Sequence, residues 1–180
     1  EPDTIFIGNP TPDGTMSYVR FASEQRVLSI DKSVTDRMKR DLNFYRTRNV
    51  LNVIDEDING VDIVRGDTDQ ITMAYTGYSW IMKNPWEMNG DDHNMNDLTD
   101  TMSKIGIRSI VAEQTDDLSQ YGLDNPRYIF TVSLKYGMPD RIVLIGDEVK
   151  IPNQKRMTYL KVFDRDAIML VDNAIVTDLS

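Results

Sequence analysis

Alternating hydrophobic and polar residues predict that much of this 180-residue chain forms short β-strands. Residues 128–136 place five apolar side chains at strict period two, and residues 70–75 alternate in the same way. Successive side chains of a strand point to opposite faces, so this pattern is typical of strands with one buried face. Apolar runs bounded by turn residues predict further strands over residues 50–54, 61–64, 78–82, 107–112 and 142–145.

One segment between these strands has the spacing of a helix. Over residues 92–105, four apolar residues recur at intervals of three or four, namely Met95, Leu98, Met102 and Ile105. Acidic residues precede this segment and Gly106 follows it, as is typical of helix ends. Strands in consecutive runs with few helices between them predict an α+β fold, with mainly antiparallel sheet and a few short helices.

An order of strands near the start of the chain returns near its end. The run Ile5-Phe6-Ile7-Gly8-Asn9 corresponds to Val143-Leu144-Ile145-Gly146-Asp147. In both places a strand with a tyrosine, a strand ending in aspartate and a helical pattern follow. The two glycines are 138 positions apart, whereas Tyr18 and Tyr159 are 141 apart, so the second loop is three residues longer. Three strands matching in order indicate an internal repeat.

The repeat divides the chain into a complete α+β unit, residues 45–180, and the last third of a preceding unit, residues 1–44. The short piece is too small to be stable alone. Its apolar positions cannot all stay exposed, and they are Ile5, Ile7, Val19, Phe21, Leu28 and Ile30. We therefore expect residues 1–44 to add strands to a sheet edge, either of the same chain or of a second copy in a strand-exchanged homodimer. The helical endings of the two copies are expected through Val34 and Met38 and through Ile175 and Leu179.

Charge and cysteine content exclude several classes of function. The chain carries 20 basic and 29 acidic residues, a net charge of −9, which argues against a partner that is nucleic acid or an anionic lipid surface. Cysteine is absent, so disulfides, thiolate metal sites and cysteine nucleophiles are excluded. The longest apolar run, residues 167–171, is far shorter than the roughly 20 residues that span a bilayer.

One acidic stretch resembles the first half of a calcium-binding loop. Asp55, Asp57 and Asn59 place oxygen ligands at alternate positions, and a glycine occupies the sixth position. The twelfth position is Gly66, where such a loop needs a bidentate glutamate. A polar turn between strands is the better interpretation, and weak calcium binding stays an alternative.

No catalytic constellation is evident in the sequence, so we expect a protein that is not an enzyme and has no cofactor. His93 is the only histidine and follows Asp91 and Asp92 at the expected helix start, where carboxylates favourably cap a helix. Consecutive residues at a helix start do not converge on one reacting atom. Hydrolysis by two carboxylates is the remaining enzymatic alternative, and it requires a cleft that holds both acids.

Several positions in order along nearly the whole chain carry a family resemblance. They are Trp80, Pro85, the helix-opening Asp92, the run Tyr121-Gly122-Leu123-Asp124-Asn125-Pro126, then Gly146 and Tyr159. With this set the chain resembles the bacterial family called domain of unknown function 4340 (DUF4340). Local chemistry also explains the run: Gly122 can adopt a positive φ that closes a helical turn, and Pro126 directs the chain into the next strand. Trp80 and Pro85 are expected to end a strand.

The resemblance implies a location and a role. Members of the family resemble extracytoplasmic, membrane-anchored proteins with tandem repeats, often encoded beside ABC-type export transporters, including gliding-type systems. No catalytic residues are established for them. We therefore expect a non-enzymatic accessory or scaffold module whose partner is a protein or envelope component such as an ABC transporter, held at the membrane by an anchor outside this chain. The alternative is a domain that binds a small molecule, a peptide or a polysaccharide.

Overall fold

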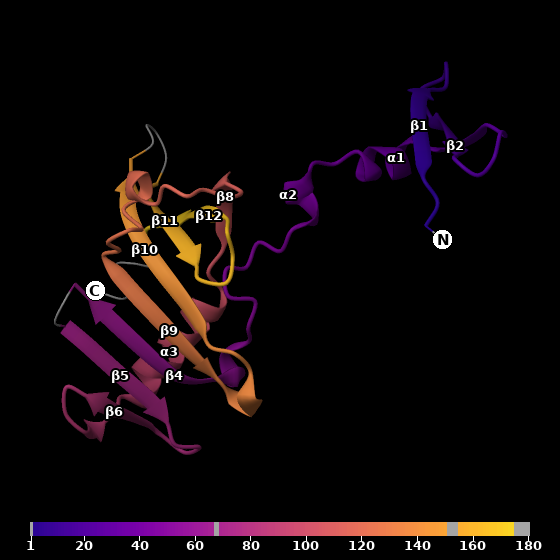
Figure 1. Cartoon of the computed structure of the whole chain (residues 1–180). Coiled ribbons are helices and arrows are strands. Elements are labelled where there is room, and N and C mark those ends of the chain that lie inside the picture. The colour runs from indigo at the N-terminus through magenta and orange to yellow at the C-terminus, as the bar shows by residue number, and fades with distance from the viewer. Residues whose placement is uncertain (1, 67–68, 151–154, 175–180) are drawn as a thin grey trace. The chain divides into compact units, whose positions relative to one another are not determined.

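A computed structural model describes residues 2–66, 69–150 and 155–174 of the chain (Figure 1). The chain divides into two compact units, Glu1–Arg46 and Thr47–Ser180, here named unit 1 and unit 2. Each unit has its own sheet, with three strands in unit 1 and nine in unit 2 over the described residues. All the strand pairs in these two sheets are antiparallel. The expected α+β fold with mainly antiparallel sheet and a few short helices is confirmed.

Unit 1 is a three-stranded meander followed by short helices. Its elements are β1 (Ile5–Pro10), β2 (Met16–Phe21), β3 (Leu28–Asp31), α1 (Lys32–Met38) and α2 (Leu42–Tyr45), with β2 in the centre of the sheet. The Asp31 carboxylate accepts a hydrogen bond from the backbone N–H of Ser33 and so caps α1. Thr35 of α1 donates a hydrogen bond of 2.8 Å to the buried Ser17 hydroxyl of β2. The helix is thereby held against the sheet.

Unit 2 is a nine-stranded sheet with one longer helix. Its strands are β4 (Ile58–Arg65), β5 (Asp69–Tyr75), β6 (Trp80–Asn84), β7 (Met88–Asn89), β8 (Ile107–Ala112), β9 (Tyr128–Leu134), β10 (Arg141–Val149), β11 (Met157–Val162) and β12 (Ile168–Asp172). They lie in the order β7-β6-β5-β4-β9-β10-β11-β12-β8. The helix is α3 (Asp92–Ser103), and three 3₁₀ turns are η1 (Asp55–Asp57), η2 (Ser119–Tyr121) and η3 (Lys135–Gly137).

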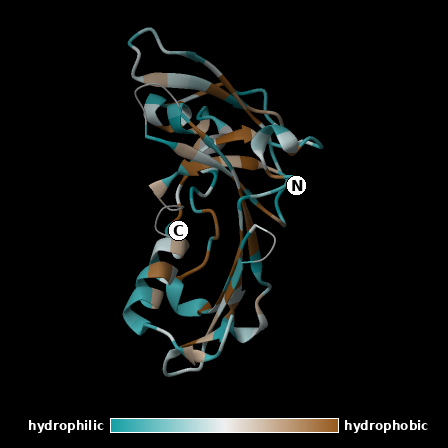
Figure 2. Ribbon diagram, turned by 90° about the vertical axis from the view of Figure 1, so that its left-hand side faces the viewer, coloured by the Kyte–Doolittle hydropathy of each residue, from teal (hydrophilic) through white to brown (hydrophobic). Residues whose placement is uncertain are grey.

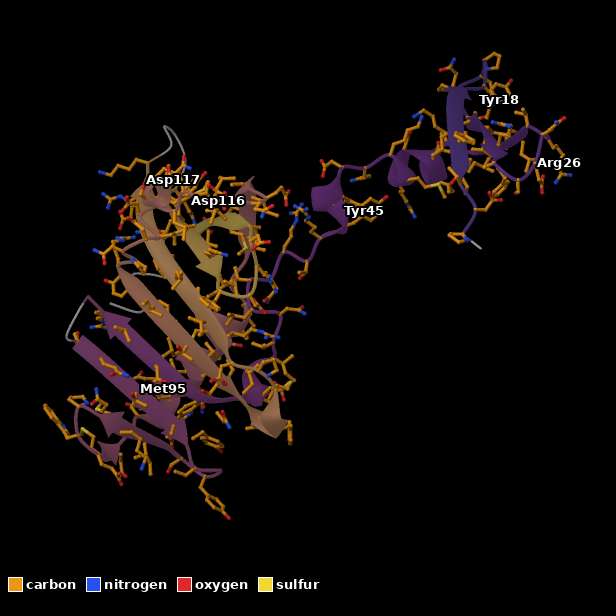
Figure 3. The ribbon with its side chains drawn as sticks, in the orientation of Figure 1. Tyr18, Arg26, Tyr45, Met95, Asp116 and Asp117 are labelled. Atoms are coloured by element: carbon orange, nitrogen blue, oxygen red, sulfur yellow. The ribbon has the colours of Figure 1, made fainter. Side chains whose placement is uncertain are left out.

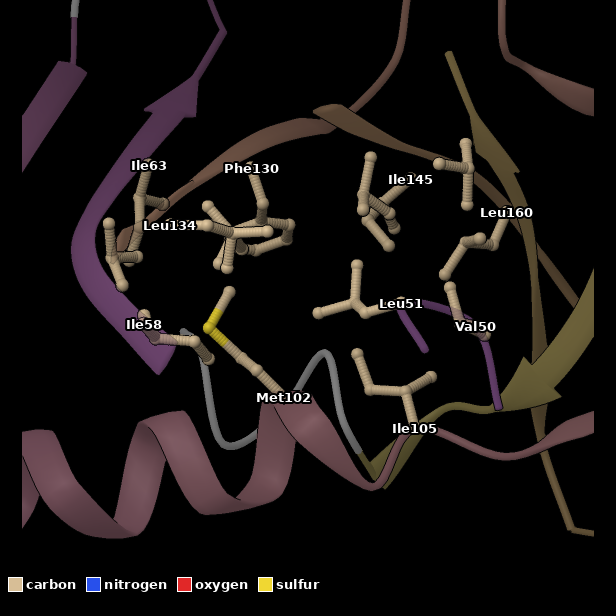
Figure 4. Packing of buried hydrophobic residues seen from close by; sticks show 14 of the residues in the cluster. Val50, Leu51, Ile58, Ile63, Met102, Ile105, Phe130, Leu134, Ile145 and Leu160 are labelled. Carbon is tan, nitrogen blue, oxygen red and sulfur yellow. The ribbon is translucent and has the colours of Figure 1, made fainter. Parts of the chain in front are cut away.

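The core of unit 2 lies between α3 and one face of the sheet. Met102 points from the helix toward Phe130 and Leu134 of β9, and Ile105 lies beside Leu51 (Figure 4). Hydrophobic residues are concentrated along the strands, whereas turns and much of the helical surface are hydrophilic (Figure 2). Burying one such side chain stabilises the fold by about 1.5–3 kcal/mol, so the alternating pattern of the strands dictates which face packs on α3.

The strand expected over residues 50–54 is wrong. Val50 and Leu51 are fully buried, but residues 50–54 form no strand, and the single antiparallel bridge beside them joins Asn49 to Gly106. Asn52 has a positive φ of 55° and its N–H is bonded to the side-chain oxygen of Asn49, so the chain turns there. A short apolar run reports burial, and burial alone does not distinguish a strand from an irregular segment packed in the core.

The two copies of the repeat have the same strand pairing. In unit 1, Ile7 of β1 pairs with Val19 of β2, and in unit 2 Ile145 of β10 pairs with Leu160 of β11. Both ladders are interrupted by an irregularity directly after these isoleucines, where the repeated glycine lies. The strand pairing of the two segments thus agrees with the internal repeat, down to the position of a bulge.

The pairing of the next strands agrees as well. Met16 pairs with Asp31 between β2 and β3, and Met157 pairs with Asp172 between β11 and β12, each offset by 141 positions. The helical ending expected through Ile175 and Leu179 lies outside the described residues. Residues 5–31 of unit 1 are therefore the structural equivalent of residues 143–172 of unit 2.

Candidate functional site

The residues singled out in the sequence gather at two places in unit 2. The first, the Tyr121 corner, comprises Tyr121, Gly122, Leu123, Arg127, Gly146 and Tyr159. The second, the Trp80 cavity, is lined by Asp55, Glu56, Ile58, Tyr75, Trp80, Asn96, Thr99 and Lys135. The sequence does not show that these residues lie together, because each place joins elements that are separated along the chain.

Local hydrogen bonds shape the loop of the Tyr121 corner. The Asp117 carboxylate accepts a hydrogen bond of 2.6 Å from the Ser119 hydroxyl, and this bond lowers the pKa of Asp117. The turn η2 ends at Gly122, whose φ of 64° is the left-handed conformation expected for this glycine. Asp116 and Asp117 lie together in the loop before the turn (Figure 3). Residues 117–126 therefore form a compact loop, which we name the Tyr121 knob.

The knob packs directly on the bulge of β10. A Cβ atom added to Gly146 would collide with the backbone carbonyl oxygen of Tyr121 and lie 3.1 Å from Leu123 Cδ2. Leu123 is only 2% exposed, and the ring of Tyr121 meets that of Tyr159 edge-on, with 4.9 Å between centroids. Glycine is needed at position 146 because no side chain fits in this contact.

Charged groups hold the knob to the end of β10. Arg127 donates through Nε to the Gly146 carbonyl at 2.7 Å and through a terminal nitrogen to Glu148 Oε1 at 3.1 Å. Glu148 also accepts a hydrogen bond of 3.2 Å from Asn173, and Arg156 approaches its other oxygen at 3.8 Å. The hydrogen bond from Arg127, aided by the one from Asn173, lowers the pKa of Glu148. These contacts hold the loop to β10 as a structural clamp, and the second terminal nitrogen of Arg127 is buried without a hydrogen-bond partner.

The equivalent corner of unit 1 is open. A Cβ on Gly8 would have Tyr18 O at 3.5 Å and Tyr18 Cβ at 3.7 Å as its nearest atoms, both from the neighbouring strand. A groove of about 230 Å³ lies there, lined by Phe6, Gly8, Tyr18, Val19, Arg20 and Val27. We name it the unit 1 groove. Tyr18, which lies among the side chains of this unit (Figure 3), is 42% exposed.

The Trp80 cavity, of about 360 Å³, combines aromatic, basic and acidic side chains. Asp92 accepts a hydrogen bond of 2.7 Å from the backbone N–H of Trp80, and the indole N–H donates to Asn96 at 3.2 Å. The Lys135 ammonium lies 5.4 Å from the centre of the Tyr75 ring. An ammonium, carboxylates and an aromatic ring around one opening can contact a small polar ligand.

The structure separates the carboxylates of the calcium-loop hypothesis. Asp55 lines the Trp80 cavity, whereas Asp57 lines a second cavity of about 310 Å³ on the side of Arg141. Asn59 lies within β4. In residues 2–66, 69–150 and 155–174, no group of three or more His, Cys, Asp or Glu side chains is arranged to hold a metal ion.

The remaining sequence-derived positions have local roles. Pro85 follows β6 directly, as expected, and its bond to Asn84 is cis. The expectation that Trp80 ends a strand is wrong, because Trp80 is the first residue of β6. The carboxylate of Asp91 caps α3 by accepting hydrogen bonds from the N–H groups of His93 and Asn94. Sequence reasoning missed the clamp of Arg127 and Glu148, which flank the recognised motifs without belonging to a pattern of their own.

Comparison with known proteins finds one family. The model of the family described as "Domain of unknown function (DUF4340)" matches residues 1–81 and again residues 80–180, which together span the chain. Two matches are consistent with the internal repeat. No curated protein and no solved structure matches the chain. Within the part of the chain that the structure describes, no helix is long and apolar enough to cross a membrane.

Proposed function

We propose that this chain, which belongs to the DUF4340 family, is a non-enzymatic interaction module of the cell envelope that assists an ABC-type export system. The observation that carries the proposal is the contrast between the two copies of the repeat. Val27 is 61% exposed in unit 1, whereas its equivalent Ile168 is fully buried in unit 2. Among the described residues of unit 1 nothing covers this surface, whereas its equivalent in unit 2 is covered by the fold of that unit.

The exposed surface has the character of a protein-binding site. On one face of the small sheet lie the exposed side chains of Phe6, Met16 and Tyr18, and Val27, directly before β3, lines the groove with Phe6 and Tyr18. Contiguous apolar surface of this kind marks sites of interaction. Unit 1 contains seven basic and seven acidic residues, whereas unit 2 contains 13 basic and 22 acidic ones. A neutral apolar surface favours a protein partner, and the family resemblance favours an envelope protein.

The chemistry of the carboxylates supports a role without catalysis. In the part of the chain that the structure describes, six carboxyl groups have a pKa shifted from its ordinary value, each of them lowered, and they are Asp3, Asp13, Asp31, Asp117, Glu148 and Asp172. Hydrolysis by two carboxylates needs an acid whose pKa is raised so that it can donate a proton. Asp92 instead accepts a hydrogen bond from the Trp80 backbone, which is a positioning contact.

Recovery of partners from native membranes tests this proposal. The tagged full chain is expected to recover a transporter subunit or another envelope component. Val27→Asp should abolish recovery, because it places a charge in the unit 1 groove. Val34→Asp is the matched control, since Val34 is an exposed valine of unit 1 that lies on α1 outside the groove. Recovery of no envelope component, or equal recovery by both variants, would contradict the proposal.

The Trp80 cavity favours a second candidate function, the binding of a small polar molecule. Tyr75 and Trp80 supply aromatic surface, and Lys135 supplies a cation at the opening. A thermal-shift screen with sugars and short peptides is expected to find ligands that raise the melting temperature of the wild-type chain but not of Lys135→Ala. Lys83→Ala, which changes an exposed lysine paired with Glu87, is the control. A screen that finds no such ligand would contradict this second function.

A further inference from the structure

The repeat gives each position of the unit 1 groove a counterpart in unit 2. Phe6 corresponds to Leu144 and Gly8 to Gly146 by the offset of 138, and Tyr18 corresponds to Tyr159 by the offset of 141. In unit 2 these counterparts lie on the sheet face opposite α3, because the alternate residues Val143, Ile145 and Leu160 belong to the core cluster. The Tyr121 knob covers that opposite face.

The unit 1 groove has the features that receive the knob in unit 2. Gly8 leaves open the space that the Tyr121 carbonyl and Leu123 occupy above Gly146. Tyr18 is exposed where Tyr159 meets the Tyr121 ring. Nothing within unit 1 itself requires a glycine at position 8, since Gly8 is not in the left-handed region and its surroundings admit a Cβ. A bulge glycine and an exposed tyrosine are what a second knob would need.

The charge of the knob segment is also complementary to that of the unit 1 groove. Residues 113–126, which contain the knob, include four acidic residues and no basic one. The unit 1 groove is lined by Arg20, whose guanidinium lies 5.0 Å from the centre of the Phe6 ring. An acidic segment that enters this groove would meet a cation at its wall. Opposite charges across an interface favour association and fix its register.

We propose that the unit 1 groove binds a segment of the same kind as residues 117–126, supplied by another repeat of this family. The strand that follows the segment then pairs antiparallel with β1, as β9 pairs with β10, where Val143 lies opposite Phe130. Ile5, the equivalent of Val143, would face the corresponding aromatic residue. This inference rests on the proposed function in that it names the partner of the exposed surface of unit 1.

The test extends the full chain at its N-terminus. Residues 116–140 are duplicated and joined ahead of residue 3, so that Asp140 connects to Asp3 as it connects to Arg141 in the natural sequence. The tether gives the added segment a high effective concentration near the groove. Hydrogen exchange of the amides of Ile5–Pro10, measured by mass spectrometry, is expected to slow at least tenfold relative to the unextended chain.

Two variants show whether the motif causes the protection. Tyr121→Ser with Leu123→Ser in the added copy alone removes the knob, and Gly8→Leu in the extended chain fills the groove. Each is expected to restore fast exchange, whereas Val34→Leu, which changes an exposed valine on α1, should leave the protection intact. Protection that is absent, or that persists in the knob and groove variants, overturns the proposal.

The same measurement identifies a competing occupant. In this chain residues 117–126 already pack on Gly146 and Tyr159, so a second copy would cover the groove with another surface. If the unextended chain becomes protected at β1 as its concentration rises and forms dimers by light scattering, that other surface is the occupant and the proposal is wrong. The hydrogen-exchange result does not depend on the recovery of partners from native membranes. Protection without an envelope partner would refute the proposed function alone, and an envelope partner without protection would refute this inference alone.

Discussion

Gly8 and Gly146 are equivalent positions of the repeat, but only Gly146 has surroundings that require a glycine. At Gly146 an added Cβ would strike the carbonyl oxygen of Tyr121, whereas at Gly8 it would meet nothing closer than 3.5 Å. The backbone carbonyl cannot move aside as a flexible side chain would. The requirement for glycine at position 146 therefore comes from the knob that packs on it, not from the strand in which it lies.

Replacing these two glycines should have unequal effects on stability. Gly146→Ala is expected to lower the free energy of unfolding by about 1–3 kcal/mol, the usual cost of overpacking. Gly8→Ala should change it by no more than about 0.5 kcal/mol. Denaturant titration followed by the fluorescence of Trp80, which is buried in unit 2, measures the first effect. A stable Gly146→Ala variant would show that the knob does not press on β10.

Glu148 should make the stability of unit 2 depend on pH. The Arg127 hydrogen bond lowers the pKa of the folded carboxyl below its ordinary value of 4.5. A depressed folded pKa contributes stability above the unfolded pKa, and this contribution is lost as the pH falls through the folded pKa. The stability advantage of wild type over Glu148→Gln is therefore expected to be full at pH 7, to shrink below about pH 4.5 and to vanish at lower pH.

Urea titrations of both proteins between pH 7 and pH 3 check this dependence. Glu87→Gln is a suitable control, because the Glu87 side chain is 69% exposed and its pair with Lys83 lies on the surface, where such pairs contribute little. A wild-type advantage that stayed constant over the whole range would argue against a stabilising role for the Glu148 carboxylate.

At the scale of an element, α3 depends on the residue that begins it. The Asp91 carboxylate accepts hydrogen bonds of 3.0 and 3.1 Å from the N–H groups of His93 and Asn94. These donors have no partner within the helix. Met95 and Met102 of the same helix pack in the core. The cap thus supports the element that covers the sheet.

Removing this cap should weaken unit 2 measurably. Asp91→Ala is expected to lower the free energy of unfolding by about 1 kcal/mol, the typical cost of losing an N-cap side chain. Asp97→Ala, which removes an exposed carboxylate near His93 on the same helix, should cost less than about 0.5 kcal/mol. Thermal unfolding followed by circular dichroism at a helix-sensitive wavelength compares the two. Equal losses would mean that the Asp91 hydrogen bonds do not stabilise α3.

At the scale of the whole molecule, charge is divided unevenly between the two units. The balance of basic and acidic residues is neutral in unit 1 and −9 in unit 2. Binding to nucleic acid draws much of its free energy from basic groups that displace counterions from phosphates. A sheet surface with this charge balance offers few such groups, even though α1 and the segment after it are locally basic.

The full chain is accordingly expected not to bind nucleic acid at physiological salt. A gel-shift titration with duplex DNA and with single-stranded RNA at about 0.15 M salt, up to micromolar protein, should give no complex. Binding that appears there and weakens steeply with added salt would contradict this expectation, and it would direct attention to the arginines around α2.

The sequence by itself determined the features that depend on neighbours along the chain. Period-two alternation located β9, turn residues located the hairpin into β10, and strand β8 has the predicted bounds of residues 107 and 112. The positive φ of Gly122 follows from a turn that its own neighbours form. The repeat was visible because both copies keep the same local order. These features are predictable because periodicity and turn chemistry act over a few residues.

Only the tertiary structure decided which of these elements meet. Residues 50–54, expected as a strand, form an irregular core segment: Val50 and Leu51 are buried in the core with Ile105, and the Val50 N–H donates to the Ile105 carbonyl, but no strand pairing continues from there. The tertiary structure also joined Trp80 to Asp92 and placed the Tyr121 knob on Gly146. Trp80 and Asp92 are 12 positions apart, and Tyr121 and Gly146 are 25 apart. Whether a bulge glycine is covered, as at Gly146, or open, as at Gly8, depends on packing that no local pattern encodes.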